Sequence, residues 1–173
     1  DIEAVCRVLS SDWLTTGPMV KQFEEAVADY VGTSYGVAVS SGTAALHAAM
    51  YALGIGPGDE VIVPPMTFAA TANCVVFQGA TPVFADIEID SFNLDPESFE
   101  KAVKETLSKG ILKPKAVIPV DLFGQCADYE KIESIAKKYG LFVIEDAAQG
   151  FGGSIKGRMA CSFGDISTTS FFP

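Results

Sequence analysis

The sequence predicts an α/β fold with a mainly parallel sheet, and two patterns carry this prediction. Short apolar runs, such as residues 61–63 and 117–118, alternate with helical segments of about ten residues or more, which is typical of βαβ units. The runs lack the polar alternation of a half-exposed strand. We therefore expect strands that are covered by helices on both faces.

The first part of the chain reads as helical, and the alternation begins near residue 35. Apolar residues at helical spacing predict helices over residues 1–9 and 20–31, separated by a loop that contains Gly17 and Pro18. The other expected elements, in chain order, are strand 35–40, helix 43–53, strand 60–63, helix 67–77, strand 82–85, helix 96–107, strand 116–120, helix 129–139, strand 141–144 and strand 166–171. We predict a helical segment at residues 1–34 and part of one α/β domain at residues 35–173.

Composition excludes several classes of function. The chain has 173 residues, 49% of them hydrophobic, and a formal charge of −10 from 22 acidic and 12 basic residues. It has no basic stripe, so we expect no nucleic-acid partner. No apolar run approaches the roughly 20 residues that span a bilayer, and the start of the chain does not read as a signal segment. We expect a cytoplasmic protein that does not enter the membrane.

The cysteines and the single histidine predict no metal site. The cysteines are Cys6, Cys74, Cys126 and Cys161, and their wide spacing matches no zinc or iron–sulfur pattern. We interpret them as reduced thiols of a cytosolic protein. His47 lies in an Ala-rich helical stretch, and one histidine does not build a usual metal site.

Asp146 follows an apolar strand directly, and this is the most informative position in the chain. Open α/β sheets bind ligands outside the carboxyl ends of their strands. A carboxylate at that edge, aimed at a cationic ring nitrogen, is what a pyridoxal phosphate enzyme needs. Gln149 is placed to donate to a ring hydroxyl. The alternative is a structural aspartate that caps a turn.

Residues 40–46 connect the first predicted strand to a helix and form a candidate phosphate site. Gly42 permits a tight turn, and the backbone N–H groups of Thr43 and Ala44 would lie free at the helix N-terminus, beside the Thr43 hydroxyl. An ordinary helix cap by Ser41 or Thr43 is the common alternative. The dinucleotide and P-loop glycine patterns are both missing from the sequence.

Two further side chains are expected at the same edge of the sheet. Phe68 follows Pro64 and Pro65 at the end of a predicted strand, where its ring can stack on a flat cofactor or pack in the core. Ser170 lies near the end of the last strand, where its hydroxyl can reach a phosphate or pair with backbone. Together with Asp146 and Thr43, these residues predict a cofactor site.

The chain resembles the DegT/DnrJ/StrS family of sugar aminotransferases, which are fold-type I pyridoxal phosphate enzymes. The matching stretches are residues 13–18, 40–46, 54–61, 64–68, 79–86, 145–149 and 170–173, in the family's order. The resemblance covers nearly the whole chain. It implies a three-layer fold-type I large domain, of which this chain is an N-terminal part that is incomplete at the C-terminus.

The resemblance also implies a role for each candidate residue. Thr43, Ala44 and Ser170 would bind the phosphate of pyridoxal 5'-phosphate. Phe68 would stack on the pyridine ring, Asp146 would pair with its nitrogen, and Gln149 would lie near its 3-hydroxyl. The Schiff-base lysine of the family follows the Ser-Phe-Phe-Pro motif by two residues, so it is expected just beyond Pro173. Lys156, in a Gly-rich turn, does not replace it.

The implied activity is transfer of an amino group from an amino acid, usually glutamate, to a nucleotide-linked keto sugar, for amino-sugar or surface-polysaccharide biosynthesis. A homodimer is implied for the full-length protein, and this chain alone is expected to be inactive. A sugar dehydratase of the same superfamily, with histidine in place of the lysine, stays open as an alternative. So do a non-catalytic cofactor-binding module and a purely structural fragment.

Overall fold

The structure is a computed structural model that describes residues 1–172. Contacts between Cα atoms divide the chain into two compact units, Asp1–Ala38 and Val39–Pro173. The boundary falls a few residues after the one expected from the sequence. The roles assigned to the two segments stay predictions.

The first unit contains two helices and an extended segment. Helix α1 spans Ile2–Leu9 and helix α2 spans Pro18–Val31, close to the predicted ranges. The expected strand at residues 35–40 is wrong, since no strand among residues 1–172 pairs with it. Its side chains are left uncovered, with Tyr35 88% and Val37 80% exposed. Glu24 of α2 instead accepts the Ala38 N–H through Oε1 at 2.8 Å.

The second unit is an α/β domain with a five-stranded sheet in which every pairing is parallel. The strands are β1 (Asp59–Val63), β2 (Thr81–Phe84), β3 (Lys113–Val117), β4 (Phe142–Asp146) and β7 (Ile166–Thr168), in the spatial order β2-β1-β3-β4-β7. The predicted α/β class with a mainly parallel sheet is confirmed. A small antiparallel hairpin of β5 (Ser154–Ile155) and β6 (Arg158–Met159) was not expected, and it turns at Lys156 and Gly157, both with positive φ.

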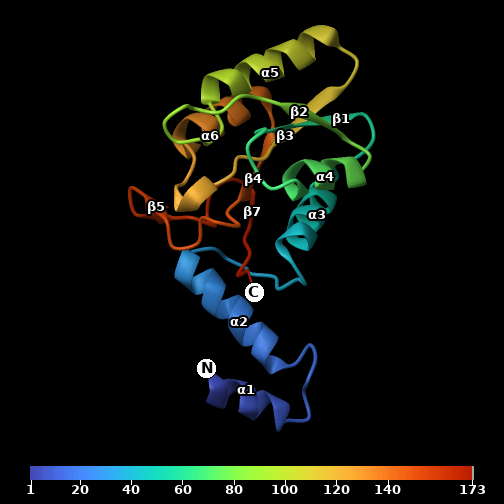
Figure 1. The fold of residues 1–173 in the computed structure, drawn as a ribbon. Coiled ribbons are helices and arrows are strands. Elements are labelled where there is room, and N and C mark those ends of the chain that lie inside the picture. Colours follow the sequence, from blue (N-terminus) through green and yellow to red (C-terminus); the bar gives the residue numbers. More distant parts are fainter. Residues whose placement is uncertain (173) are drawn as a thin grey trace. The chain divides into compact units, whose positions relative to one another are not determined.

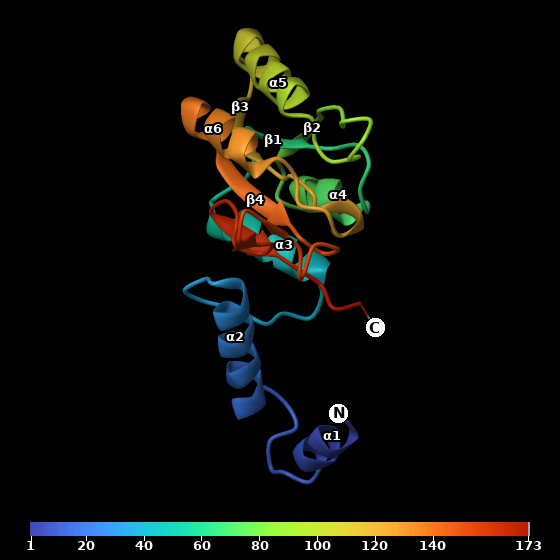
Figure 2. The ribbon, with the colours of Figure 1, turned by 90° about the vertical axis from the view of Figure 1, so that its left-hand side faces the viewer.

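Helices cover both faces of the sheet, which gives three layers (Figures 1 and 2). Helices α3 (Gly42–Ala52) and α4 (Ala70–Phe77) lie on one face, and α5 (Pro96–Lys109) and α6 (Tyr129–Tyr139) lie on the other. A 3-10 turn, η1 (Leu122–Gly124), follows β3. Adjacent strand residues such as Val61 and Ile62 belong to different core clusters, because successive side chains of a strand point to opposite faces.

Local sequence signals set most helix ends. The Asp95 carboxylate accepts the N–H groups of Glu97 and Ser98 at the start of α5, and Asp128 caps α6 in the same way. Gly110 ends α5 in the left-handed conformation, with φ 64°. Helix α4 begins at Ala70 rather than at residue 67, because the two prolines before it favour a turn over residues 64–69.

Candidate functional site

Asp146 is the last residue of β4 and lies at the carboxyl edge of the sheet. Its side chain is only 4% exposed. Oδ2 accepts a hydrogen bond from Thr71 Oγ1 at 2.8 Å, and Oδ1 accepts one from the Ala148 N–H at 3.3 Å. Burial raises the pKa of this carboxyl, and the Thr71 hydroxyl opposes that shift. No lysine, arginine or histidine among residues 1–172 forms an ion pair with Asp146.

Glu145, the preceding residue, lies on the other face of the strand and is fully buried. Oε1 accepts the Cys161 N–H at 2.7 Å, and Oε2 accepts the Phe163 N–H at 2.8 Å and the Ser167 hydroxyl. Burial raises the pKa of Glu145 to about 8. The neighbouring carboxyl group of Asp121 adds to that rise.

Asp121 is a second buried carboxyl group beside Glu145, and burial raises its pKa as well. Oδ1 of Asp121 accepts from the Ala127 N–H at 3.0 Å and from the Tyr129 hydroxyl at 2.8 Å. Oδ2 has no hydrogen-bond partner among residues 1–172.

The N-terminus of α3 and the segment after β7 lie together. A Cβ placed on Gly42 would be 3.2 Å from Ser170 Cβ and 3.7 Å from Ser170 Oγ. Ser41 caps the helix by accepting the Ala44 N–H at 3.1 Å. The prediction of a free Ala44 N–H is therefore wrong, and the alternative of a helix cap by Ser41 is confirmed. The Thr43 N–H and hydroxyl donate no hydrogen bond within residues 1–172.

Helix α4 contacts both Asp146 at the end of β4 and Thr43 at the start of α3. Thr71, in its first turn, donates to Asp146 of β4. Cys74, one turn further on, lies with Sγ 3.4 Å from the carbonyl oxygen of Thr43 in α3. Burial raises the pKa of the Cys74 thiol, so it stays protonated and able to donate. Sequence reasoning missed both residues, because their partners lie far away along the chain.

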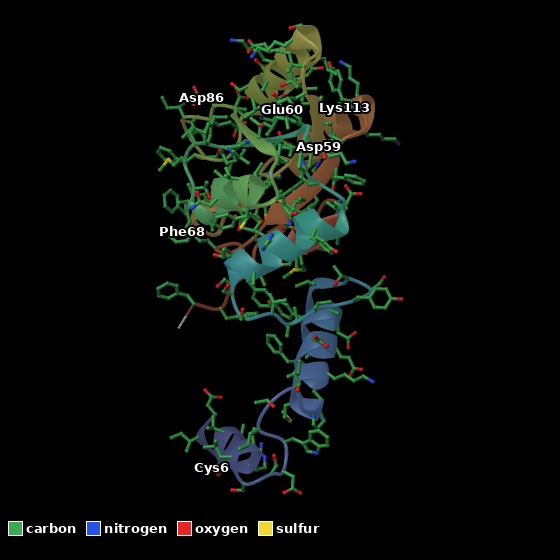
Figure 3. The ribbon with its side chains drawn as sticks, turned by 90° about the vertical axis from the view of Figure 1, so that its right-hand side faces the viewer. Cys6, Asp59, Glu60, Phe68, Asp86 and Lys113 are labelled. Carbon is green, nitrogen blue, oxygen red and sulfur yellow. The ribbon has the colours of Figure 1, made fainter. Side chains whose placement is uncertain are left out.

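Phe68 lies in the turn between β1 and α4, and its ring is 78% exposed. The alternative that the Phe68 ring packs in the core is therefore wrong for residues 1–172. Figure 3 shows Phe68 at the opposite end of the strands from Asp59, Glu60 and Lys113, which lie where β1 and β3 begin. Its ring is thus on the same edge of the sheet as Asp146.

Gln149 is exposed and follows β4 by three residues. Its Oε1 accepts the N–H of Phe123 at 2.8 Å, and Phe123 has a positive φ of 57° inside η1. Its amide nitrogen donates no hydrogen bond within residues 1–172. Gln149 thus supports a strained turn and still has a donor to offer a ligand.

The other polar clusters do not form metal sites. Within residues 1–172 no group of three or more His, Cys, Asp or Glu side chains could hold a metal ion, and all four cysteines are free. His47 is exposed, and its ring centroid lies 6.2 Å from that of Phe77. No helix among the described residues is long and apolar enough to cross a bilayer.

The arrangement fits a flat, cationic ring that carries a phosphate. Asp146 offers a buried carboxylate that no cation among residues 1–172 pairs with, and Phe68 offers an exposed ring. Gly42, next to Thr43, lies close to the Ser170 side chain. Pro173 and the expected lysine position lie outside the described residues. No hydrogen bond or ion pair joins Phe68 or Gln149 to Asp146, Thr43 or Ser170 within residues 1–172, so a ligand would connect them.

Comparisons with known proteins identify the family of this chain. A profile of the DegT/DnrJ/EryC1/StrS aminotransferase family matches residues 1–173. The chain is 47% identical over 167 residues to a UDP-2-acetamido-2-deoxy-3-oxo-D-glucuronate aminotransferase of Pseudomonas aeruginosa, covering 96% of this chain and 45% of the relative. It is 42% identical over 169 residues to a GDP-perosamine synthase of Caulobacter vibrioides, covering 97% and 44%.

Solved structures show the same fold. A DegT DnrJ EryC1 StrS aminotransferase from Brucella abortus superposes with a TM-score of 0.98 at 45% identity, over 99% of this chain and 46% of that one. The PLP form of a sugar aminotransferase from Streptococcus pneumoniae, described as putative, gives 0.89 at 34% identity, over 99% and 46%. The fold is therefore that of the fold-type I aminotransferases. The chain spans less than half the length of these relatives.

Proposed function

Because the chain belongs to the DegT/DnrJ/EryC1/StrS aminotransferase family, we propose that the full-length protein is a pyridoxal phosphate-dependent aminotransferase. It moves an amino group from an amino acid to a nucleotide-linked keto sugar. The relatives from P. aeruginosa and C. vibrioides are named for UDP-linked and GDP-linked sugars, which supports this class of acceptor. The homodimer, the glutamate donor and the cytoplasmic location stay predictions.

The buried carboxylate of Asp146 carries this proposal. A buried charge without a partner is costly, so native proteins pair such groups or neutralise them. Asp146 has two hydrogen-bond donors and no cation among residues 1–172, at the edge of the sheet where ligands bind. A protonated pyridine nitrogen would supply the missing cation and the missing donor together.

Each of the other candidate residues then has one task. Thr43 and Ser170 bind the phosphate at the N-terminus of α3, where the helix dipole favours an anion, and the Ala44 N–H joins them by leaving Ser41 Oγ. Phe68 holds one face of the ring, and the Gln149 amide donates to its 3-hydroxyl. Asp146 keeps a proton on the ring nitrogen. Pyridoxal phosphate supplies an electron sink when it is bound in this way.

Titrating the full-length protein with pyridoxal phosphate tests this proposal, with the visible absorbance as readout. We expect an imine band near roughly 410–430 nm, and a lysine two residues after Pro173 that forms it. A histidine at that position, with no band from a protein imine, would turn the assignment to a sugar dehydratase. Absence of any binding would contradict the cofactor site itself.

A further inference from the structure

Two threonine hydroxyls lie behind the Asp146 carboxylate. Thr71 is fully buried in the first turn of α4, and its Oγ1 lies 2.8 Å from Asp146 Oδ2. Thr67, half-buried in the turn before α4, has its Oγ1 2.9 Å from Thr71 Oγ1. The three groups form one continuous row of hydrogen bonds that leads from the turn to the end of β4.

The direction of these hydrogen bonds follows from counting protons. An ionised carboxylate only accepts, so the single hydroxyl proton of Thr71 points to Asp146. The oxygen of Thr71 is then the acceptor for Thr67, whose own proton points to Thr71. Hydrogen bonds that run in one direction polarise each other, so the hydroxyl of Thr67 strengthens the bond that Thr71 donates.

The same short segment carries the exposed ring of Phe68. Residues 67 and 71 flank it in sequence, and the two prolines at positions 64 and 65 fix the backbone just before it. One segment thus sets the ring that faces the cofactor and the hydroxyls that hold the carboxylate.

We propose that Thr71, supported by Thr67, is a positioning residue that keeps Asp146 ionised and aimed at the ring nitrogen of the cofactor. This inference rests on the proposed function, and it adds two residues that act through Asp146 rather than on the cofactor. Removing the Thr71 hydroxyl makes the carboxylate more basic, because burial then acts on it without that donor. The proton shared by carboxylate and ring nitrogen then moves toward the carboxylate.

The test uses the full-length protein and pyridoxamine phosphate labelled with ¹⁵N in the ring, which needs no lysine to bind. The ring ¹⁵N chemical shift reports whether the nitrogen is protonated. In the wild type and in Thr71→Ser we expect a protonated nitrogen. In Thr71→Val we expect a shift toward the unprotonated nitrogen and a Kd raised about tenfold, as loss of a hydrogen bond to a charged group implies.

Three further variants separate positioning from simple packing. Thr106→Val removes a buried threonine hydroxyl from α5, away from the site, and should change neither the shift nor the Kd. Thr67→Val should change the ring ¹⁵N chemical shift in the same direction as Thr71→Val, but by less. It replaces Thr71→Val in the test if that variant does not fold. In an Asp146→Asn background, Thr71→Val should have no further effect on the shift.

Two results would overturn the inference. One is an unchanged ring ¹⁵N shift in both Thr71→Val and Thr67→Val, with the wild type binding normally. The other is an equal loss of affinity in Thr71→Val whether position 146 is Asp or Asn, which is the result expected of a purely structural residue. If the wild type binds no pyridoxamine phosphate, the proposed function falls and this inference falls with it.

Discussion

The two faces of the last residues of β4 differ in how they treat a buried carboxyl group. On one face, Glu145 receives three hydrogen bonds from protein donors, and burial raises its pKa to about 8. On the other face, Asp146 receives two and faces no cation among residues 1–172. Both are buried, so burial alone does not mark a site. A buried charge that the described residues leave without a cation does mark one.

The largest effect is expected from Asp146→Asn in the full-length protein. The amide has the same shape but holds the ring proton poorly, so kcat/KM should fall about 10²–10³-fold, as for other lost electrostatic contacts in active sites. The thermal midpoint should stay the same or rise, since a buried charge is removed. Steady-state kinetics and a melting curve test both, with the exposed Asp90→Asn as control.

Glu145→Ala should act on folding instead. It leaves the buried N–H groups of Cys161 and Phe163 without an acceptor, and each costs about 1–3 kcal/mol. We expect a loss of about 3 kcal/mol or more in the free energy of unfolding, measured by urea denaturation. A loss of stability equal in Asp146→Ala would remove the contrast between the two faces.

The pH dependence of stability should carry the signature of Glu145. Its pKa is about 8 in the folded protein, above its ordinary value of 4.5, so the folded state binds the extra proton. Stability is therefore highest below the ordinary pKa and falls as the pH rises to about 8, by at most about 1.4 kcal/mol per pH unit. The nearby Cys126 and Cys161 thiols, each with a pKa of about 12, stay neutral in this range.

Glu145→Gln should flatten that part of the curve. Its amide still offers an oxygen acceptor to the buried donors and, like the protonated carboxyl, it carries no charge. Urea denaturation between pH 5 and pH 9 compares the two proteins. A wild-type curve that falls no more steeply than the variant's would show that the pKa of Glu145 is not raised in the folded protein.

Gln149→Ala should have the smallest effect. The side chain is exposed, and its loss removes one neutral hydrogen bond to the Phe123 N–H. Such a bond contributes about 0.5–1 kcal/mol, so stability should change little and the Kd for pyridoxamine phosphate should rise about threefold. Isothermal calorimetry measures the Kd. A rise in this Kd as large as the rise caused by Asp146→Asn would show that Gln149 contributes as much to cofactor binding as Asp146 does.

Most of the fold could be predicted because its signals are local. Helix α6 has the expected bounds, and β4 and α5 differ from theirs by one or two residues at their ends. The strand at residues 35–40 failed for a non-local reason. The short apolar run at residues 37–39 predicts a strand, but a strand also needs a partner, and none lies among residues 1–172.

The candidate site also combines residues that local sequence patterns predict with residues that they do not. Asp146 and Thr43 could be chosen from the sequence, because each follows a local pattern at a strand end or a helix start. Thr71 could not, since its partner Asp146 is 75 residues away in sequence. The raised pKa values of Asp121 and Glu145 were equally hidden, because each residue alone reads as an ordinary acid after an apolar run.

A crystal structure of the full-length protein with pyridoxamine phosphate tests the central claim most directly. The account predicts the pyridine nitrogen about 2.7–2.9 Å from an Asp146 carboxylate oxygen, the usual length of a charged N–H···O bond. It also predicts the phosphate between the N-terminus of α3 and Ser170, with Phe68 against the ring. A ring nitrogen that faces solvent or another residue, with Asp146 unpaired, would contradict it.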